Sequence, residues 1–364
     1  MNSKLQISNS KILITGGMGY LGSHAIVALQ QAGYTVVSAD NHSNSQPDVA
    51  DRIARITGIK PRNYVIDVCD RQSLEQLFLE EGPFAGVIHM AAYKSVAESV
   101  EQPLKYYANN LMSLLQLLHC CNKFDVHYLV FSSTCTVYGE PEQLPVNESH
   151  PINPMSPYGK TKAIGEQIIR DFVGTHRLQA MTLRFFNPVG AHPSAEIGEF
   201  PRGVPSNLLP YMAQTAAGQH PFLRIWGDDY PTPDGTCVRD YIHVCDLAEV
   251  HLKALEHLMA RKNKLGYEVI NIGTGEGISV KEMHAAFEVV NGIQVPYKVL
   301  EHRPGDIVSM YADNRKAHEL LHWHPRFTLH DMVRTAWQWQ LRNASSQITQ
   351  ITQKAAASAA KKTV

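Results

Sequence analysis

Short apolar runs alternate with longer amphipathic stretches through the first half of the chain. The runs lie at residues 12–14, 35–37, 64–66, 87–88, 128–131 and 181–183. Because they are continuously apolar, they predict strands buried on both faces, as in a parallel sheet covered by helices. Between them, Leu104, Leu111, Leu114 and Leu118 recur at helical spacing, and Gly33 stands where the first helix should end. The predicted fold class is α/β, a doubly wound parallel sheet of the Rossmann type.

This alternation breaks after about Asn187, where Gly and Pro become frequent and the elements become short. The change predicts a smaller C-terminal lobe. We predict a Rossmann domain over residues 10–186, to which part of 237–270 returns, and a second lobe over 187–342. Residues 1–9 and 343–364 are polar or low in complexity, so both termini are predicted to be disordered.

Charge and cysteine usage narrow the functional classes. The 364 residues include 33 basic and 34 acidic ones, so no overall field favours a nucleic acid or an anionic membrane. The six cysteines have neither metal-ligand spacing nor short disulfide loops, which fits a reducing cytoplasm. No run of about 18 apolar residues and no signal-peptide core is present. We expect a cytoplasmic protein without nucleic-acid or membrane partners.

A glycine-rich loop connects the first predicted strand to the first predicted helix. Gly16, Gly19 and Gly22 are spaced so that the chain turns tightly, a pyrophosphate can approach the backbone, and the helix packs closely on the sheet. The amides at the helix start, around Tyr20 and Leu21, would face the phosphates. The alternative is an ordinary glycine-rich turn, but strand, loop and helix occur in the order that nucleotide binding requires.

Two acidic residues follow later strands of the same domain. Asp40 ends the second strand about 20 residues beyond the loop, where a carboxylate can bind both ribose hydroxyls of NAD and repel the extra phosphate of NADP. NAD is therefore the predicted cofactor. Asp67 follows the third strand and is a weaker candidate for an adenine contact. The alternative for Asp40 is a polar turn residue.

Tyr158 and Lys162 present a phenol and an amine from one helix face, one turn apart. A nearby ammonium favours the phenolate, so the pair predicts a lowered Tyr158 pKa and a base that works near neutrality. Thr134 follows the fifth predicted strand, at the carboxyl edge where open parallel sheets bind ligands. The alternatives are a core tyrosine, a solvated lysine and a strand-capping threonine.

Several separated motifs resemble the extended short-chain dehydrogenase/reductase family, and within it most closely the UDP-glucose 4-epimerases. The resemblance extends from about Lys11 to about Arg342. Besides the glycine loop and Asp40-Asn41, it rests on residues 89–94, 131–139, 156–162, 184–190 and 238–243. It implies that the Thr134 hydroxyl contacts the sugar 4-oxygen, that Tyr158 is the base, and that Lys162 binds the nicotinamide ribose.

The resemblance also implies a set of binding residues, with the lobe over 187–342 binding mainly substrate. The implied NAD contacts are Gly16, Gly19, Tyr20, Leu21, Gly22, Asp40, Asn41, Asn44, Asp67, Val68, Ala91, Lys94, Asn109, Tyr158, Lys162 and Phe186. The implied contacts to a UDP-sugar are Lys94, Thr134, Tyr158, Asn187, Asn207, Leu208, Leu223, Trp226, Arg239, Arg303, Asp306 and Met310. Guanidinium groups suit a pyrophosphate because they offer fixed, bidentate donors, which favours Arg239 and Arg303 as its clamp.

The implied reaction is reversible C4 epimerisation of UDP-glucose and UDP-galactose, through a transient 4-keto sugar and tightly bound NAD. The family's 4,6-dehydratases carry an Asp-Glu pair after the catalytic threonine, whereas Cys135 and Thr136 stand here. Loss of water would therefore lack its acid catalyst. Related decarboxylases usually carry a Glu where Thr136 stands. The resemblance implies that Met310 faces the sugar 2-substituent, where a bulky residue excludes N-acetyl sugars and a small one admits them. Methionine is long but adaptable, so we expect N-acetyl sugars to react slowly.

Other readings stay open at this point. An NAD-dependent dehydrogenase of a hydroxysteroid or another alcohol would share Thr134, Tyr158 and Lys162, and an epimerase of UDP-N-acetylhexosamines would share the whole site. A nucleotide-sensing regulator would need none of the three catalytic residues. His318, His322 and His324 lack an acidic or Cys companion, so no metal is expected. The resemblance implies a homodimer through helices around 104–121 and 158–176, although their apolar stripes could also pack wholly on the sheet.

Overall fold

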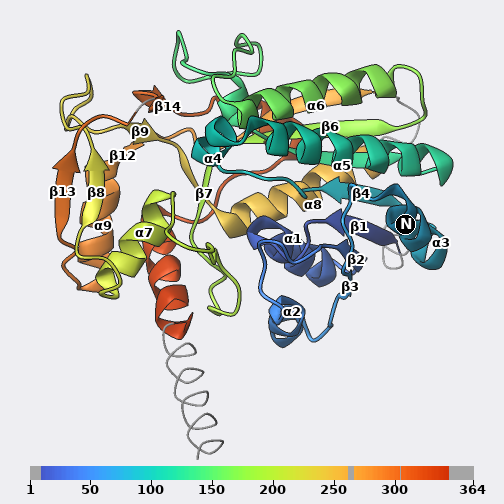
Figure 1. Ribbon diagram of the computed structural model, residues 1–364, viewed down its shortest axis with the longest axis horizontal. Coiled ribbons are helices and arrows are strands. Elements are labelled where there is room, and N and C mark those ends of the chain that lie inside the picture. The colour runs from blue at the N-terminus through green and yellow to red at the C-terminus, as the bar shows by residue number, and fades with distance from the viewer. Residues whose placement is uncertain (1–9, 261–265, 304, 344–364) are drawn as a thin grey trace, which may run out of the picture.

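Seven parallel strands form the central sheet of the computed structural model, which describes residues 10–260, 266–303 and 305–343. The strand order is β11-β6-β5-β4-β1-β2-β3. Figure 1 labels β6, β4, β1, β2 and β3 of this sheet. The strands are β1 (Lys11–Thr15), β2 (Thr35–Ala39), β3 (Arg62–Tyr64), β4 (Gly86–His89), β5 (Tyr128–Thr134), β6 (Gln179–Phe185) and β11 (Tyr267–Ile272). The order reverses between β1 and β4, and this topological switch point is where such sheets bind ligands. The predicted doubly wound α/β fold is confirmed.

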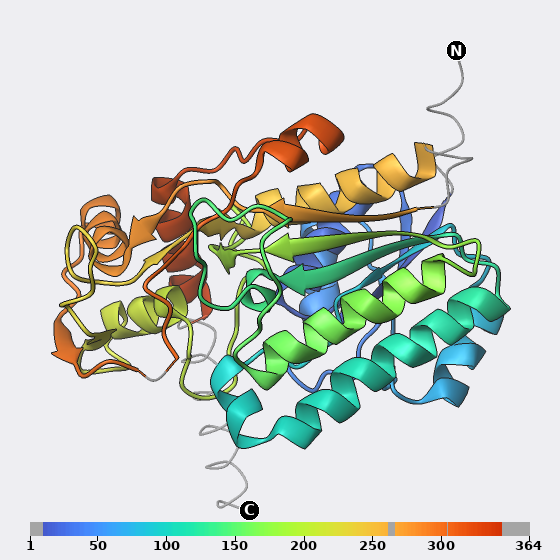
Figure 2. The ribbon, with the colours of Figure 1, turned by 90° about the horizontal axis from the view of Figure 1, so that it is seen from above.

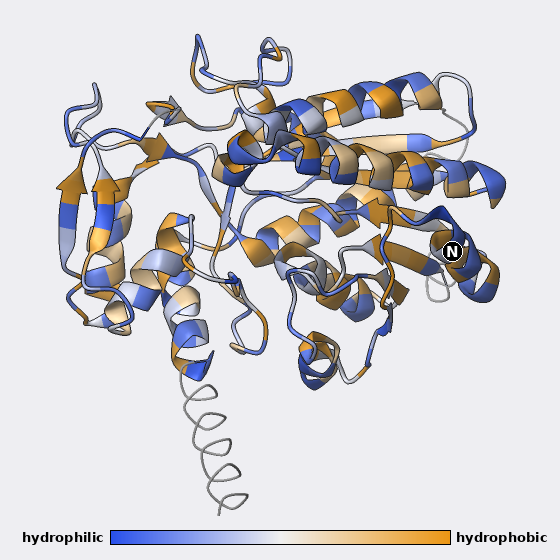
Figure 3. Ribbon diagram, in the orientation of Figure 1, coloured by the Kyte–Doolittle hydropathy of each residue, from blue (hydrophilic) through white to orange (hydrophobic). Residues whose placement is uncertain are grey.

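Helices cover both faces of this sheet (Figure 2). Ile12 and Ile14 of β1 pack toward α1 (Tyr20–Gln31) and α8 (Val244–Ala260), whereas Leu13 belongs to the cluster formed with α3, α5 and α6. The remaining helices of the domain are α2 (Val49–Thr57), α3 (Arg71–Glu81), α4 (Val96–Glu101), α5 (Pro103–Lys123) and α6 (Pro157–Val173). Burial on both faces explains why the strand sequences are continuously apolar, and Figure 3 shows β1 and β2 as hydrophobic segments.

The third strand lies two residues earlier in the chain than its sequence indicates. It was predicted over residues 64–66, but β3 ends at Tyr64, and Val65 is exposed. The reason is position, because β3 is an edge strand and pairs only with β2. An edge position does not bury every apolar side chain, so an apolar run there does not define where the strand begins and ends.

The second lobe combines short strands and helices around its own core. Three small sheets contain β7 (Asn187–Val189) with β10 (Tyr241–His243), β9 (Val238–Arg239) with β12 (Ile278–Ser279) and β14 (Ser309–Met310), and β8 (Leu223–Trp226) with β13 (Tyr297–Leu300). The helices that pack on this core are α7 (Leu208–Ala216), α9 (Val280–Asn291) and the helical residues 329–343, whereas α10 (Arg315–Leu321) packs against α8 and β11 of the Rossmann domain. A capping box of Ser279 and Glu282 starts α9. The lobe lies beside the carboxyl ends of the large sheet's strands (Figure 1).

Two later elements belong to the large sheet's domain. Helix α8 packs on the sheet, and β11 pairs with β6. The exact domain limits stay a prediction. Asn343, the first residue of the predicted tail, belongs to the last described helix and donates to the Trp339 carbonyl at 2.9 Å. The other residues predicted to be disordered, 1–9 and 344–364, lie outside the described residues.

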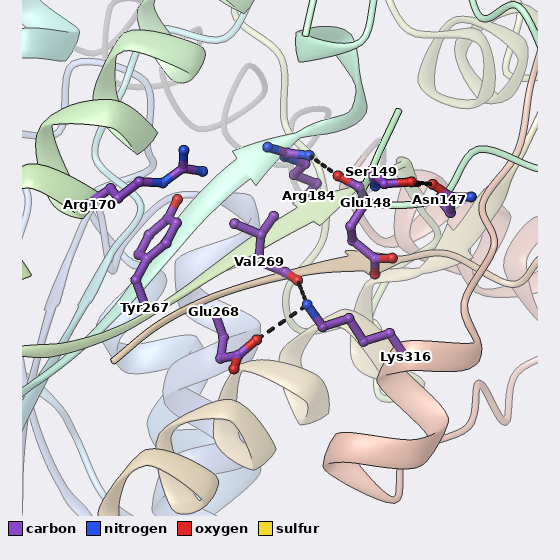
Figure 4. A pocket seen from close by; sticks show the side chains of 9 residues that line it. All are labelled: Asn147, Glu148, Ser149, Arg170, Arg184, Tyr267, Glu268, Val269 and Lys316. Atoms are coloured by element: carbon purple, nitrogen blue, oxygen red, sulfur yellow. Dashed lines mark hydrogen bonds and ion pairs between the residues drawn. The ribbon is translucent and has the colours of Figure 1, made fainter. Parts of the chain in front are cut away.

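The outer edge of β11 is covered by side chains (Figure 4). Lys316 donates to the Val269 carbonyl at 2.7 Å and pairs with Glu268 at 3.2 Å, while Glu148 accepts from the Asn271 amide at 2.8 Å. A hollow of about 680 Å³ remains there, and none of the residues that line it is a predicted site residue. These contacts satisfy backbone groups that an edge strand would otherwise expose.

Candidate active site

The glycine loop meets the end of β4 at the switch point of the sheet. Gly16 has a φ of +72°, and a Cβ added there would lie 2.9 Å from the Ala91 amide nitrogen. A Cβ on Gly22 would lie 2.1 Å from the Gly16 carbonyl oxygen. Only glycine therefore permits these approaches. The first amides of α1, from Tyr20 to Gly22, have no intrahelical partner, and Gly19 provides no side-chain cap. The loop thus has the geometry of an anion site.

Asp40 connects this loop to the segment after β2. Its carboxylate accepts from the Met18 amide at 3.0 Å, the His42 amide at 2.8 Å and the Ser45 hydroxyl at 3.2 Å. The side chain is buried. A carboxylate can accept about four hydrogen bonds, so this one fixes the loop and retains capacity for a further donor.

Four further predicted NAD contacts follow β2 and β3, and they differ in exposure. Asn41 and Asn44 are exposed on the loop after β2. Asp67 is exposed after β3 and accepts from the Cys69 amide at 2.8 Å, whereas Val68 is buried. The Asp67 carboxylate therefore already orders its own turn.

Thr134, Tyr158 and Lys162 lie together at the carboxyl end of β5 and the start of α6, and all three are buried. Ser156 caps α6, and its hydroxyl accepts from the Gly159 amide at 3.1 Å, which fixes the turn that carries Tyr158. The Thr134 hydroxyl accepts from the Thr136 amide at 3.2 Å. The Lys162 ammonium donates to the Ser132 carbonyl at 2.7 Å.

The predicted direction of the Tyr158 pKa is wrong for this structure. Burial raises the pKa of the phenol well above its ordinary value, and the neighbouring Thr134 hydroxyl opposes this only in part. The Lys162 ammonium is directed at the Ser132 carbonyl, and burial lowers the pKa of Lys162 to about 8. Helical spacing predicted the proximity of the two groups but not the desolvation that both undergo.

Sequence reasoning missed a buried ion pair behind Lys162. Glu166, one turn further along α6, accepts from Arg184 of β6 at 2.5 Å and from the Ser133 hydroxyl at 2.5 Å. Both charged side chains are about 95% buried. The Lys162–Glu166 spacing on one helix face was a usable signal, but nothing in the sequence indicated Arg184 as the partner.

The predicted pyrophosphate clamp comes together around one carboxylate of the second lobe. Arg303 pairs with Asp306 at 2.6 Å, and Arg239 lies 4.0 Å from the same oxygen. The Arg303 side chain is 47% exposed. Two cations therefore share one anion in the described structure, which leaves positive charge for an anionic ligand.

Met310 connects this clamp to the catalytic end of β5. It pairs in register with Arg239, and its buried side chain belongs to one apolar cluster with Cys135 and Phe186. Asn187 begins β7, and its amide donates to the Asp240 carbonyl at 2.9 Å.

Leu223 and Trp226, two of the predicted contacts to a UDP-sugar, differ in burial. Trp226, at the end of β8, is partly exposed, whereas Leu223 is buried in the lobe's core. Of the two side chains, only that of Trp226 is available to a ligand in this structure.

Lys94 and Asn207 meet at a residue that the sequence did not single out. The Glu199 carboxylate pairs with the Lys94 ammonium at 2.8 Å and accepts from the Asn207 amide at 2.9 Å. Leu208 follows as the partly buried first residue of α7. Asn109 lies apart on α5, where its side chain donates to Asn110 at 3.0 Å.

Asn110 is a further residue that the sequence analysis missed. Its buried side chain donates to the Tyr93 carbonyl at 3.1 Å and to the Thr161 hydroxyl at 3.1 Å, and accepts from the Tyr93 amide at 2.9 Å. It therefore fastens the loop that carries Lys94 to the helix that carries Tyr158 and Lys162.

All six cysteines are free thiols. No three His, Cys, Asp or Glu side chains in the described ranges could together hold a metal ion. None of the described helices is long and apolar enough to cross a membrane.

The fold and the site define a nucleotide-binding enzyme of the Rossmann class. A family model described as GDP-mannose 4,6 dehydratase matches residues 13–336. Curated UDP-glucose 4-epimerases of Bacillus subtilis and Mus musculus are 47% and 44% identical to this chain; each alignment covers 92% of this chain and 98% of the relative. The chain belongs to this family and, within it, to the UDP-glucose 4-epimerases. The resemblance inferred from the motifs is confirmed.

Solved structures agree with this assignment. A UDP-glucose 4-epimerase from Stenotrophomonas maltophila, with bound NAD and formylated UDP-arabinopyranose, is 46% identical and superposes with a TM-score of 0.90 over 93% of this chain and 99% of its own. The enzyme from Bifidobacterium longum, in complex with NAD+ and UDP, is 44% identical with a TM-score of 0.88 over 92% and 99%.

Proposed function

We propose that this protein interconverts UDP-glucose and UDP-galactose by inverting C4 of the sugar, with tightly bound NAD as cofactor. The observation that carries the proposal is the buried group of Thr134, Tyr158 and Lys162 beside the glycine loop. It occurs in a chain 47% identical to a UDP-glucose 4-epimerase over nearly its whole length.

The residues present fit NAD. Side chains at Gly16 or Gly22 would fill the loop that must approach a pyrophosphate, and the Asp40 carboxylate lies where an adenosine ribose is bound in this fold. Lys162 and Asn109 are the proposed contacts on the nicotinamide side. When bound, NAD supplies the acceptor for the hydride of C4 and a positive charge in the site.

Tyr158 takes the proton of the sugar 4-hydroxyl, and the Thr134 hydroxyl orients that oxygen. Because burial raises the pKa of Tyr158, the phenol requires nearby positive charge to ionise near neutrality. Lys162 alone does not overcome the effect of burial, so the positive charge that NAD would add beside it is required as well. The 4-keto sugar that forms would rotate in the site, so that the hydride could return from bound NAD to the opposite face of C4 and give the epimer.

The second lobe holds the nucleotide part of the substrate. Arg239 and Arg303 bind the diphosphate, which competes with Asp306 for the guanidinium groups. Asp306 is then free to accept from a uridine ribose hydroxyl. Met310 is buried against Cys135 and Phe186, so added bulk at the sugar 2-position is disfavoured and UDP-glucose and UDP-galactose are the preferred substrates.

We further propose that the protein is a cytoplasmic homodimer. Leu104, Met112 and Leu115 of α5 and Ile164 of α6 are exposed on two adjacent helices. Such neighbouring apolar residues suit a contact between the same helices of two copies. Sedimentation of the purified protein, with Leu115→Glu as the disrupting variant, tests the dimer. The six free thiols fit the reducing compartment.

The test of function uses purified protein and UDP-galactose without added cofactor. Chromatography over time should show UDP-glucose forming, and the same final mixture should be reached from either sugar. If conversion needs added NAD, the enzyme lost its cofactor during purification. Absence of conversion both with and without added NAD contradicts the proposal. Stoichiometric release of NADH indicates an alcohol dehydrogenase instead.

A further inference from the structure

The segment from residue 196 to Asn207 leaves the second lobe and contacts the Rossmann domain. Arg202 donates to the His42 carbonyl at 2.8 Å and to the Ser45 carbonyl at 3.2 Å, on the loop that Asp40 holds. Glu196 pairs with Arg55 of α2 at 2.8 Å. The segment therefore connects the two sides of the site, and it carries no residue predicted from the sequence before Asn207.

Glu199 has a specific place within this segment. One carboxylate oxygen contacts both Lys94, which follows β4 on the Rossmann side, and Asn207, the N-cap residue before α7 of the second lobe. Lys94 is a proposed contact of the cofactor and substrate, and Asn207 of the substrate. Lys94 and Asn207 are 113 residues apart in sequence, and both contact Glu199.

The surroundings hold the Glu199 carboxylate in place. The Glu199 carbonyl accepts from the Trp339 indole at 2.8 Å, and the Glu199 side chain is only 10% exposed. The Lys94 ammonium also lies 5.8 Å from the ring centre of Tyr20, at the start of α1. An anion at Glu199 thus keeps Lys94 over the mouth of the glycine loop.

We propose that Glu199 is a positioning residue, which orients Lys94 toward the cofactor and Asn207 toward the sugar nucleotide. This inference rests on the proposed function. Glu199 contacts none of the proposed reacting groups, so its effect passes through its two partners. Removing its charge leaves Lys94 without its counterion and frees Asn207 from a shared acceptor.

The test compares Glu199→Gln with Glu196→Gln in the purified holoenzyme. Both glutamates lie in one segment with side chains 10% exposed, but Glu196 pairs with Arg55 and contacts neither Lys94 nor Asn207. In Glu199→Gln we expect NAD loss during repeated filtration and the KM for UDP-galactose each to rise about tenfold, as for a lost charge-assisted hydrogen bond. The kcat with excess NAD should change less than about twofold.

Glu196→Gln should match the unmodified enzyme in NAD retention and KM. Equal behaviour of the two variants overturns the inference, while the epimerase activity of the unmodified enzyme keeps the proposed function standing. A preparation of unmodified enzyme with neither bound NAD nor turnover would instead contradict the function.

Two further variants separate positioning from general structure. If Glu199 acts through Lys94, the double variant Glu199→Gln, Lys94→Met should lose NAD no faster than whichever single variant loses it faster. Additive effects of the two substitutions on NAD loss overturn the inference. Glu199→Asp keeps the charge and should recover most of the retention lost in Glu199→Gln. An aspartate variant no better than glutamine also overturns it, and this comparison remains informative if Glu199→Gln folds poorly.

Discussion

The two sides of the site are built by different forces. On the Rossmann side, Thr134, Tyr158 and Lys162 are buried and held by backbone groups and core packing. On the substrate side, Arg303 is 47% exposed and held by an ion pair with Asp306. The first arrangement forms on folding, whereas the second can exchange its partners for a ligand. Substitutions should therefore affect turnover and stability on one side and substrate affinity on the other.

The largest effect is expected from Tyr158→Phe, which removes the proposed base and keeps the ring. We expect kcat to fall about 10²- to 10⁴-fold, the usual range for one acid–base group. The KM for UDP-galactose should change little, because the nucleotide is bound by the other lobe. Steady-state conversion of UDP-galactose measures both constants.

The control for this variant is Tyr34→Phe. Tyr34 is equally buried, and its hydroxyl has no hydrogen-bond partner among the described residues. Activity should be retained there. Comparable losses in the two variants would show that Tyr158 contributes only packing.

The next effect concerns the buried ion pair behind Lys162. Glu166→Gln leaves the Arg184 guanidinium buried with a neutral partner, so the free energy of unfolding should fall by about 3–5 kcal/mol. Asp306→Asn breaks the more exposed pair of the substrate side and should cost less than about 1 kcal/mol. Urea unfolding of both variants measures the difference. Equal losses would remove the contrast between the two sides.

The success of the sequence predictions follows the same division. Continuous apolar runs predicted the sheet, because a strand that is buried on both faces needs apolar residues at successive positions of its own sequence. The glycine loop and the Tyr158–Lys162 spacing were readable for the same reason, since each is local. Glu199 and Arg184 were not, because the fold brings their partners from distant segments. The direction of the Tyr158 pKa shift depends on burial, which the short segment from Tyr158 to Lys162 does not indicate by itself.

Acid should weaken the Rossmann side through its buried histidines. Burial lowers the pKa of His24 and of His89 to about 3, so the folded protein keeps both imidazoles neutral where the unfolded chain binds protons. The stabilisation is complete above about pH 6.5 and is lost as the pH falls toward 3. Each such proton contributes about 1.4 kcal/mol per pH unit to the slope of the unfolding free energy.

The variant that tests this is His24→Gln, whose amide can still donate to the Tyr20 carbonyl, the present partner of His24. Its unfolding free energy, measured by urea at pH values from 7 to 4, should fall less steeply with acid than that of the unmodified protein. His330→Gln, at an exposed histidine of the second lobe, serves as control and should leave the slope unchanged. An unaltered slope in His24→Gln would contradict the assignment.

The smallest expected effect separates the affinity for UDP-galactose from the free energy of unfolding at one position. Arg303→Lys keeps the charge beside Asp306 but loses the planar, bidentate donor that suits a diphosphate. We expect the KM for UDP-galactose to rise about 3- to 10-fold, kcat to stay within about twofold, and the urea midpoint to be unchanged, since exposed ion pairs contribute little to folding. Glu166→Gln should give the opposite pattern, with a large loss of stability. If Arg303→Lys instead lowered the urea midpoint and left KM unchanged, Arg303 would be a structural residue, and the substrate side would be organised by folding like the Rossmann side.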